Sequence, residues 1–353
     1  MKKGLLIIAL MLTTTFTFAQ DETPSAPATT FAGSADMYYK YDFSNQQGNG
    51  LTSFTSAHNS FELGMASIEA SHKMGKASVF VDLGFGSRAS EFTYNDDANT
   101  FMIKQLNFTY EFSDKFKVIA GSFGTHIGYE LLDAVDNKNY SMSYAFTNGP
   151  FFNTGVKAQY TSGKFSIMAG VTNPTDFKSA IDAGSTQKTF IGQLGYVADS
   201  GSAYFNVTSG SANPTSDKNI TQFDFVGSKK LSDAFSLGFN GTYAMVADDF
   251  DSDLDGEWFS LVGYANYTFK ENLSLAYRLE YFDDEDGLTA SSSVRGGVGS
   301  VVGNTLSLNY KVGNLTIIPE IRYDSASEDV FFDSDAAATG SNAYVLLATT
   351  YTF

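Results

Sequence analysis

The sequence has no cysteine, three histidines and a single tryptophan among its 353 residues. Without cysteine the chain can form no disulfide scaffold, no thiol nucleophile and no cysteine-ligated metal site. The histidines His58, His72 and His126 stand in separate segments, and no Gly-x-Ser-x-Gly or His-Glu-x-x-His motif is present. One catalytic cluster is conceivable, His126 with Ser122 and Glu130, but it carries no recognised motif. The sequence therefore predicts a protein that is not an enzyme.

The chain also lacks any long apolar run after its first 20 residues. A membrane-spanning helix needs roughly 20 predominantly apolar residues, so a helical membrane protein is excluded. Positive charge is scarce as well, with 22 Lys and Arg against 39 Asp and Glu and a net charge of −17. Because a surface of this sign repels phosphate groups, nucleic acid is excluded as a partner.

The first residues have the pattern of a secretory signal peptide. Two lysines precede an apolar stretch at residues 5–18, and small residues suit cleavage after Ala19. The stretch is too short for the alternative, a single N-terminal anchor helix. We expect residues 1–19 to be removed on export and residues 20–30 to form a flexible polar lead-in.

The last residues form a strand pattern that ends on an aromatic side chain. Residues 342–353 alternate with the period of two that a strand requires, and Phe353 closes the pattern. A strand of membrane-spanning length that ends in Phe is the familiar closing element of outer-membrane barrels in Gram-negative bacteria. We expect Tyr351 and Phe353 to be the signal that the barrel assembly machinery recognises.

Very short and long connections alternate along the chain from Phe31 onward. Seven short connections carry the Gly, Asn, Asp and Ser residues of tight hairpins. Eight longer connections lie between them, so the chain holds about sixteen strands. This layout predicts an all-β fold, a transmembrane antiparallel up-and-down β-barrel with short periplasmic turns and long extracellular loops over residues 31–353. The alternative, a soluble β-sandwich, does not require this strict alternation.

Charged side chains repeatedly occupy the same alternate positions of these strands, so they lie on one face. In 273–281 the odd positions are apolar or aromatic, whereas Arg278 and Glu280 occupy even positions. A charge facing lipid near mid-membrane costs roughly 2–4 kcal/mol, so this parity should face a water-filled lumen. The residues expected to line the pore are Lys117, Lys157, Arg278, Glu280, Glu320 and Arg322.

The connection at 124–150 is the longest and is rich in apolar residues. Long loops with apolar side chains usually pack against something, and the lumen is the nearest place. We therefore expect this loop to fold inward and to set the field at the narrowest point of the pore. The constriction would hold His126, Glu130, Asp133, Asp136 and Lys138. The alternative is a surface cap in which Lys138 pairs with Asp136.

Residues 121–157 carry a distinctive motif. Its parts are Gly121-x-Phe123-Gly124-Thr125-x-Ile127-Gly128-Tyr129-Glu130, Asp136-Asn137-x-Asn139-Tyr140-Ser141-x-Ser143-Tyr144 and Gly149-Pro150-Phe151-Phe152-x-Thr154-Gly155-Val156. In this stretch the chain resembles the OmpL-like β-barrel porin-2 family. The resemblance implies an outer-membrane barrel with porin-like activity.

An acidic stretch has part of a calcium-loop pattern. Asp251, Asp253 and Asp255 stand at positions 1, 3 and 5 with Gly256 at position 6. Position 12 is Val262 instead of Glu, so an EF-hand is excluded. A loosely bound Ca²⁺ that bridges the rim to lipopolysaccharide is one interpretation, and a solvated acidic loop is the other.

These patterns predict a passive aqueous channel in the outer membrane of a Gram-negative bacterium. It would pass small hydrophilic solutes and ions and lean weakly toward cations, because acids dominate the loops. No cofactor is expected, and the partners would be outer-membrane lipid and lipopolysaccharide. A substrate-specific channel and a plugged structural or adhesive barrel without conductance are the alternatives, and the sequence leaves a homotrimer or a monomer open.

Overall fold

The computed structural model describes most of the chain after the first 27 residues. The described ranges are 28–95, 102–180, 187–211, 218–248, 255–293 and 297–353. The predicted signal peptide lies outside them. None of the helices in the described ranges is long and apolar enough to cross a bilayer.

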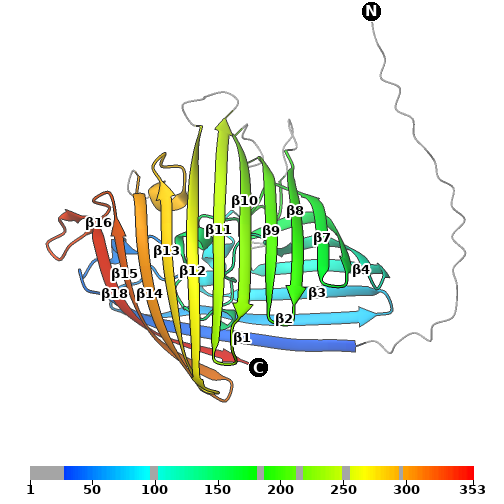
Figure 1. Cartoon of the computed structure of the whole chain (residues 1–353), viewed down its shortest axis with the longest axis horizontal. Coiled ribbons are helices and arrows are strands. Elements are labelled where there is room, and N and C mark those ends of the chain that lie inside the picture. Colours follow the sequence, from blue (N-terminus) through cyan, green and yellow to red (C-terminus); the bar gives the residue numbers. More distant parts are fainter. Residues whose placement is uncertain (1–27, 96–101, 181–186, 212–217, 249–254, 294–296) are drawn as a thin grey trace, which may run out of the picture.

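Sixteen antiparallel strands in these ranges close into a barrel, as predicted (Figure 1). Each strand pairs with its neighbours in sequence, and β18 pairs with β1 to close the wall. The first strand begins at Ala28, so residues 28–30 belong to the barrel and not to the expected lead-in. The strands are β1 (Ala28–Asp42), β2 (Ser60–Met74), β3 (Ala77–Phe85), β4 (Ile103–Ser113), β5 (Phe116–Gly124), β6 (Phe152–Ser162), β7 (Phe165–Thr172), β8 (Thr189–Ala198), β9 (Gly201–Ser211), β10 (Lys218–Lys230), β11 (Phe235–Asp248), β12 (Gly256–Lys270), β13 (Leu273–Asp284), β14 (Gly299–Val312), β15 (Leu315–Ala326) and β18 (Ser341–Thr352).

The seam joins the two ends of the barrel. The backbone N–H groups of Gly33 and Phe353 each donate to the other residue's carbonyl oxygen at 3.0 Å. Tyr351 and Phe353 are exposed on the outer face. A side chain at Gly33 would meet the Phe353 ring, so glycine lets the terminal aromatic ring pack closely against β1.

The two faces of the wall follow the predicted parity. On β13, Tyr277 and Leu279 are exposed on the outer face, whereas Arg278 and Glu280 are fully buried inside. Outward apolar residues and inward polar residues are the expected pattern of a transmembrane barrel.

One rim holds the tight turns and the other holds the long loops. Gly75 and Gly313 supply the positive φ angles, 59° and 62°, of two turns. Within the described residues, the loop segments contain only short helices and one small hairpin. These are η1 (Gln47–Asn49), α1 (Ser87–Phe92), η2 (Ala134–Asp136), α2 (Tyr144–Thr147), α3 (Ala290–Ser293) and the pair β16 (Phe331–Phe332) and β17 (Ala338–Thr339).

Candidate functional site

The segment between β5 and β6, residues 125–151, lies inside the barrel; we call it the inward loop. Its first part follows the inner wall from β9 to β12. The His126 ring bonds to the Val207 carbonyl oxygen at 3.0 Å, and the Gly128 N–H donates to Asp224 at 3.0 Å. Tyr129 then stacks on Tyr264 with 4.2 Å between ring centroids. The loop is thus anchored strand by strand as it leaves the wall.

Arg278 on β13 is the main anchor of the inward loop. Its guanidinium group donates to Glu130 at 2.6 Å, to the Ser141 carbonyl at 2.5 Å and to the Met142 carbonyl at 3.1 Å. The Glu280 carboxylate, 3.3 Å from Arg278, accepts the Tyr144 N–H at 2.7 Å. One buried cation therefore joins two separate parts of the loop to the wall.

Arg322 and Glu280 extend this network to β15. Arg322 donates to the Met142 carbonyl at 2.7 Å and to Asp324 at 2.8 Å, and it lies 3.1 Å from Glu280. Both arginines are fully buried, and each is paired with carboxylates. Pairing of this kind offsets the large free-energy penalty of removing charges from water.

Tyr140 ties the loop to the seam. Its N–H donates to Glu320 on β15 at 2.7 Å, and its hydroxyl donates to Asp36 on β1 at 2.5 Å. Next to it, Asn139 donates to Ser307 on β14 at 2.7 Å. Residues 139–146 are consequently buried throughout.

Asp133 anchors the loop on the opposite side of the lumen. Lys104 on β4 donates to both Asp133 carboxylate oxygens at 2.8 Å and lies 2.9 Å from Asp82. The Ser67 hydroxyl also donates to Asp133, at 2.9 Å. The loop therefore spans the lumen from one side of the wall to the other.

The five predicted constriction residues differ in their surroundings. Glu130 and Asp133 are held by Arg278 and Lys104, so neither presents an unpaired charge. Burial, reinforced by nearby Lys157, lowers the pKa of His126 to about 4, so its ring is neutral at pH 7. The side chains of Asp136 and Lys138 are exposed. The five residues do not form one charged ring. 

The six predicted pore-lining residues face inward, but four of them are covered. Arg278, Glu280, Glu320 and Arg322 are at most 3% exposed, because the inward loop lies on them. Lys117 and Lys157 are half-buried. The four covered residues hold the loop and do not line an open lumen.

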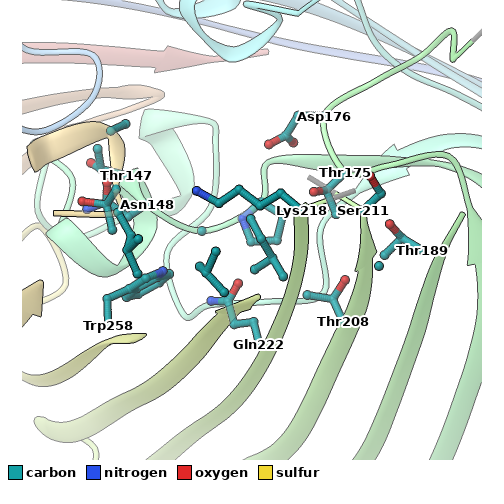
Figure 2. Close-up of a pocket in the computed structure, with 18 of the residues that line it drawn as sticks. Thr147, Asn148, Thr175, Asp176, Thr189, Thr208, Ser211, Lys218, Gln222 and Trp258 are labelled. Atoms are coloured by element: carbon teal, nitrogen blue, oxygen red, sulfur yellow. The ribbon is translucent and has the colours of Figure 1, made fainter. Parts of the chain in front are cut away.

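Two cavities lie on opposite sides of the inward loop. The outer cavity, about 200 Å³, is near the long-loop rim and is bounded by Asn148, Thr208 and Trp258 (Figure 2). The inner cavity, about 310 Å³, is near the turn rim and is bounded by Lys138 and Lys311 among others. A solute that crosses the barrel would have to pass the loop between them.

Two parts of the inner wall differ in exposure. The inward side chains of β13, β14, β15, β18 and β1, which we call the covered arc, are buried where the inward loop lies on them. Closer to the turn rim, Ser274, Lys311 and Thr316 on the same strands are not buried and line the inner cavity. The inner faces of β5, β6 and β8, which we call the uncovered arc, bury Phe123, Asn153 and Ile191 near the inward loop but keep half-exposed polar side chains further from it. These are Lys117, Lys157, Gln159 and Gln193.

Residues 28–353 match the family model described as "Putative beta-barrel porin-2, OmpL-like". The chain belongs to this porin family. No curated protein shows significant similarity to the chain. The porin has the fold of several solved outer-membrane proteins. Its location is the outer membrane, as expected.

Three solved structures illustrate the similarity in fold. The outer membrane channel DcaP of Acinetobacter baumannii is 12% identical over 93% of this chain and 97% of its own, with a TM-score of 0.60. The anion-selective porin from Comamonas acidovorans is 11% identical over 93% and 100%, with a TM-score of 0.62. The trimer form of OmpT from Vibrio cholerae is 12% identical over 93% and 100%, with a TM-score of 0.60.

The candidate calcium ligands lie largely outside the described residues, and two members of the conceivable catalytic cluster have other partners. Asp251 and Asp253 lie outside the described residues, Asp255 is exposed, and within the described ranges no group of three or more candidate ligands is placed to hold a metal ion. The side chains of His126 and Glu130 are engaged by different parts of the porin, a backbone carbonyl on β9 and Arg278 on β13.

Three anchors of the inward loop escaped the sequence reading. Lys104, Asp36 and Arg88 are single charges with no motif around them, and only inward parity marks the two that lie on strands. Arg88 lies in α1, where it donates to the Leu132 carbonyl at 3.1 Å and lies over the Tyr140 ring. Their partners are remote in sequence, so local spacing carried no signal.

Proposed function

We propose that this porin is a passive channel for small hydrophilic solutes and ions, with the inward loop as its narrowest part. The route follows the uncovered arc. The contrast in exposure between the two arcs carries this proposal, because a water-filled path needs polar side chains that are not sealed by protein. At the level of the inward loop the covered arc offers almost none.

Ion selectivity arises from two opposing charge sets. Exposed acids at the long-loop rim attract cations to the entrance, and the half-exposed Lys117 and Lys157 oppose them inside. The buried carboxylates of Glu130, Asp82 and Asp324 are paired with cations and contribute little. Among the described residues, Asp224 and Glu320 accept hydrogen bonds from neutral donors only and add to the negative set. We infer a weak lean toward cations. The rim acids are Asp255, Glu285, Asp286, Glu328 and Asp329.

Cysteine substitution tests the route, because the chain has no cysteine of its own. Lys157→Cys places a thiol on the uncovered arc, and Ser307→Cys places one beneath the loop on the covered arc. In planar bilayers, a charged methanethiosulfonate reagent should quickly change the single-channel current of Lys157→Cys and leave that of Ser307→Cys unchanged. Modification of Ser307→Cys alone would show that the route has been assigned to the wrong arc.

A plugged structural or adhesive barrel is the second candidate. The extensive bonding of the inward loop to the covered arc favours it, because such a loop does not leave its place readily. The same recordings decide between the two functions. A barrel that inserts but carries no current would overturn the channel proposal and support the plugged barrel.

We infer further partners from the outer surface. The exposed apolar face contacts outer-membrane lipid, and Phe353 is available to the barrel assembly machinery. A homotrimer is supported by the trimer form of OmpT, and cross-linking in native membranes tests it. Ca²⁺ bridging of the acidic rim to lipopolysaccharide is tested by calcium titration of stability, and no catalytic step is proposed.

A further inference from the structure

The outer cavity is a built polar site on the entry side of the inward loop. Its wall is a diagonal of inward residues on β8, β9, β10 and β12, namely Thr189, Thr208, Gln222 and Trp258. The end of the inward loop, with Asn148, forms the facing wall (Figure 2). Pro150 also lines the cavity. A solute approaching from the long-loop rim would meet this cavity before it reaches the loop.

Two threonine hydroxyls in the cavity are unsatisfied. Thr189 and Thr208 are 2% and 4% exposed, and their Oγ1 atoms find no hydrogen-bond partner within the described part of the porin. Both side chains are among those that line the cavity (Figure 2). A buried polar group without a partner is destabilising, so such groups commonly indicate a ligand or water position. Each hydroxyl can both donate and accept a hydrogen bond.

The amide and aromatic groups around these hydroxyls are held in place. Gln222 donates to the Thr242 hydroxyl at 2.7 Å, and Asn148 donates to the Tyr144 carbonyl at 2.9 Å and to Ser291 at 3.0 Å. Trp258 packs on Phe282 with 6.0 Å between ring centroids. Side chains fixed in this way bind a solute without a large loss of conformational entropy.

Among the described residues of the cavity wall, the one carboxylate is already occupied. Asp176 accepts the N–H groups of Phe151 and Phe152 at 2.7 and 2.9 Å, and the Tyr94 hydroxyl donates to it at 3.2 Å. The groups left for recognition are therefore the two threonine hydroxyls, the Gln222 amide and the Trp258 indole. This set suits hydroxyl groups better than a fixed charge.

We propose that the outer cavity binds a neutral polyhydroxylated solute of about monosaccharide size before it passes the inward loop. The cavity volume of about 200 Å³ lies below the roughly 300–1,000 Å³ of drug-sized ligand pockets, which limits the occupant to one small molecule. The inference rests on the proposed channel function, since a solute held here needs a route onward.

Titration of single-channel current with D-glucose tests the site in the full-length mature porin. We expect glucose to cause a saturable fall in the ion current. Triethylene glycol, which has few hydroxyls, should cause no saturable fall. Thr189→Val and Thr208→Val should each raise the apparent Kd for glucose about 3- to 10-fold, because each variant loses one neutral hydrogen bond. The control Thr221→Val removes a hydroxyl from the outer face of β10, where Thr221 pairs with Ser209 at 2.7 Å, and should leave the Kd unchanged.

The outcomes separate this site from the channel itself. Absence of any current overturns the channel proposal and this one together. A normal ion current that glucose does not block saturably overturns the site alone. A saturable block whose Kd is the same in wild type and in both valine variants also overturns the site alone. Saturation by inorganic phosphate in place of glucose overturns the assignment to neutral solutes. The wild-type titration remains decisive if a valine variant fails to fold, which heat-dependent gel mobility reports.

Discussion

The covered and uncovered arcs belong to one wall and follow one alternation of inward and outward residues, yet their inward charges have different surroundings. On the covered arc, Arg278 and Arg322 are sealed under the inward loop and paired with carboxylates. On the uncovered arc, Lys117 and Lys157 stay half-exposed. An inward charge can therefore either fix a loop or contact a passing solute. The residues that surround the charge decide which of these roles it has.

The largest effect is expected on the covered arc, from Arg278→Met. The change leaves Glu130 and Glu280 buried with less compensating charge, and breaking a buried pair in this way costs about 3–5 kcal/mol. Urea unfolding of the barrel refolded in lipid measures the loss. Lys157→Met on the uncovered arc should lose much less, and equal losses would contradict the distinction between the arcs.

The next effect depends on pH at the rim above the uncovered arc. Burial raises the pKa of Asp176, in the loop after β7, to about 6. Between about pH 4 and 6, Asp176 binds a proton more tightly in the folded porin than in the unfolded chain. The stability contributed by the protonated Asp176 carboxyl therefore falls as pH rises through that window. The fall amounts to roughly 3 kcal/mol at most. Unfolding of wild type and Asp176→Asn across this range should differ in slope, and parallel curves would refute the prediction.

A smaller loss of unfolding free energy is expected from Tyr140→Phe, at the side of the covered arc nearest the seam. The variant removes the hydroxyl that donates to Asp36 at 2.5 Å, and a hydrogen bond to a charged group contributes about 1.5–3 kcal/mol. Tyr310→Phe, on the outer face of β14, is the matched control and should change little. A similar loss of unfolding free energy in both variants would mean that the loop contact is unimportant.

The smallest effect concerns selectivity. Lys157→Gln removes a positive charge beside the proposed route, and a unit charge about 7 Å from a passing ion contributes about 0.6 kcal/mol in water. The permeability ratio from reversal potentials should therefore shift toward cations about two- to threefold. Lys40→Gln, which removes a buried charge on the covered arc, should not shift it. An equal shift in both variants would remove the basis for calling one arc uncovered.

Much of the barrel was predictable because its signals are local. Turn residues at seven short connections set the strand number, and the parity of Arg278 and Glu280 identified the inner face. The start of β1 was placed three residues late, because the polar sequence at 28–30 has no apolar alternation even though it pairs with β2.

The site was predictable only in part. The length and apolar content of 124–150 indicated an inward loop, but its charges were interpreted as facing the pore. The partners of Glu130 and Asp133 lie 148 and 29 residues away in the sequence. No spacing rule connects such residues, so the loop charges could not be recognised as paired.

By itself, the sequence determined that this chain closes into an outer-membrane barrel, because alternation and turn chemistry act between neighbours along the chain. Only the tertiary structure decided which inward charges are buried and which remain accessible. That distinction depends on where the inward loop lies against the wall, and it is set by contacts between strands that are remote in sequence.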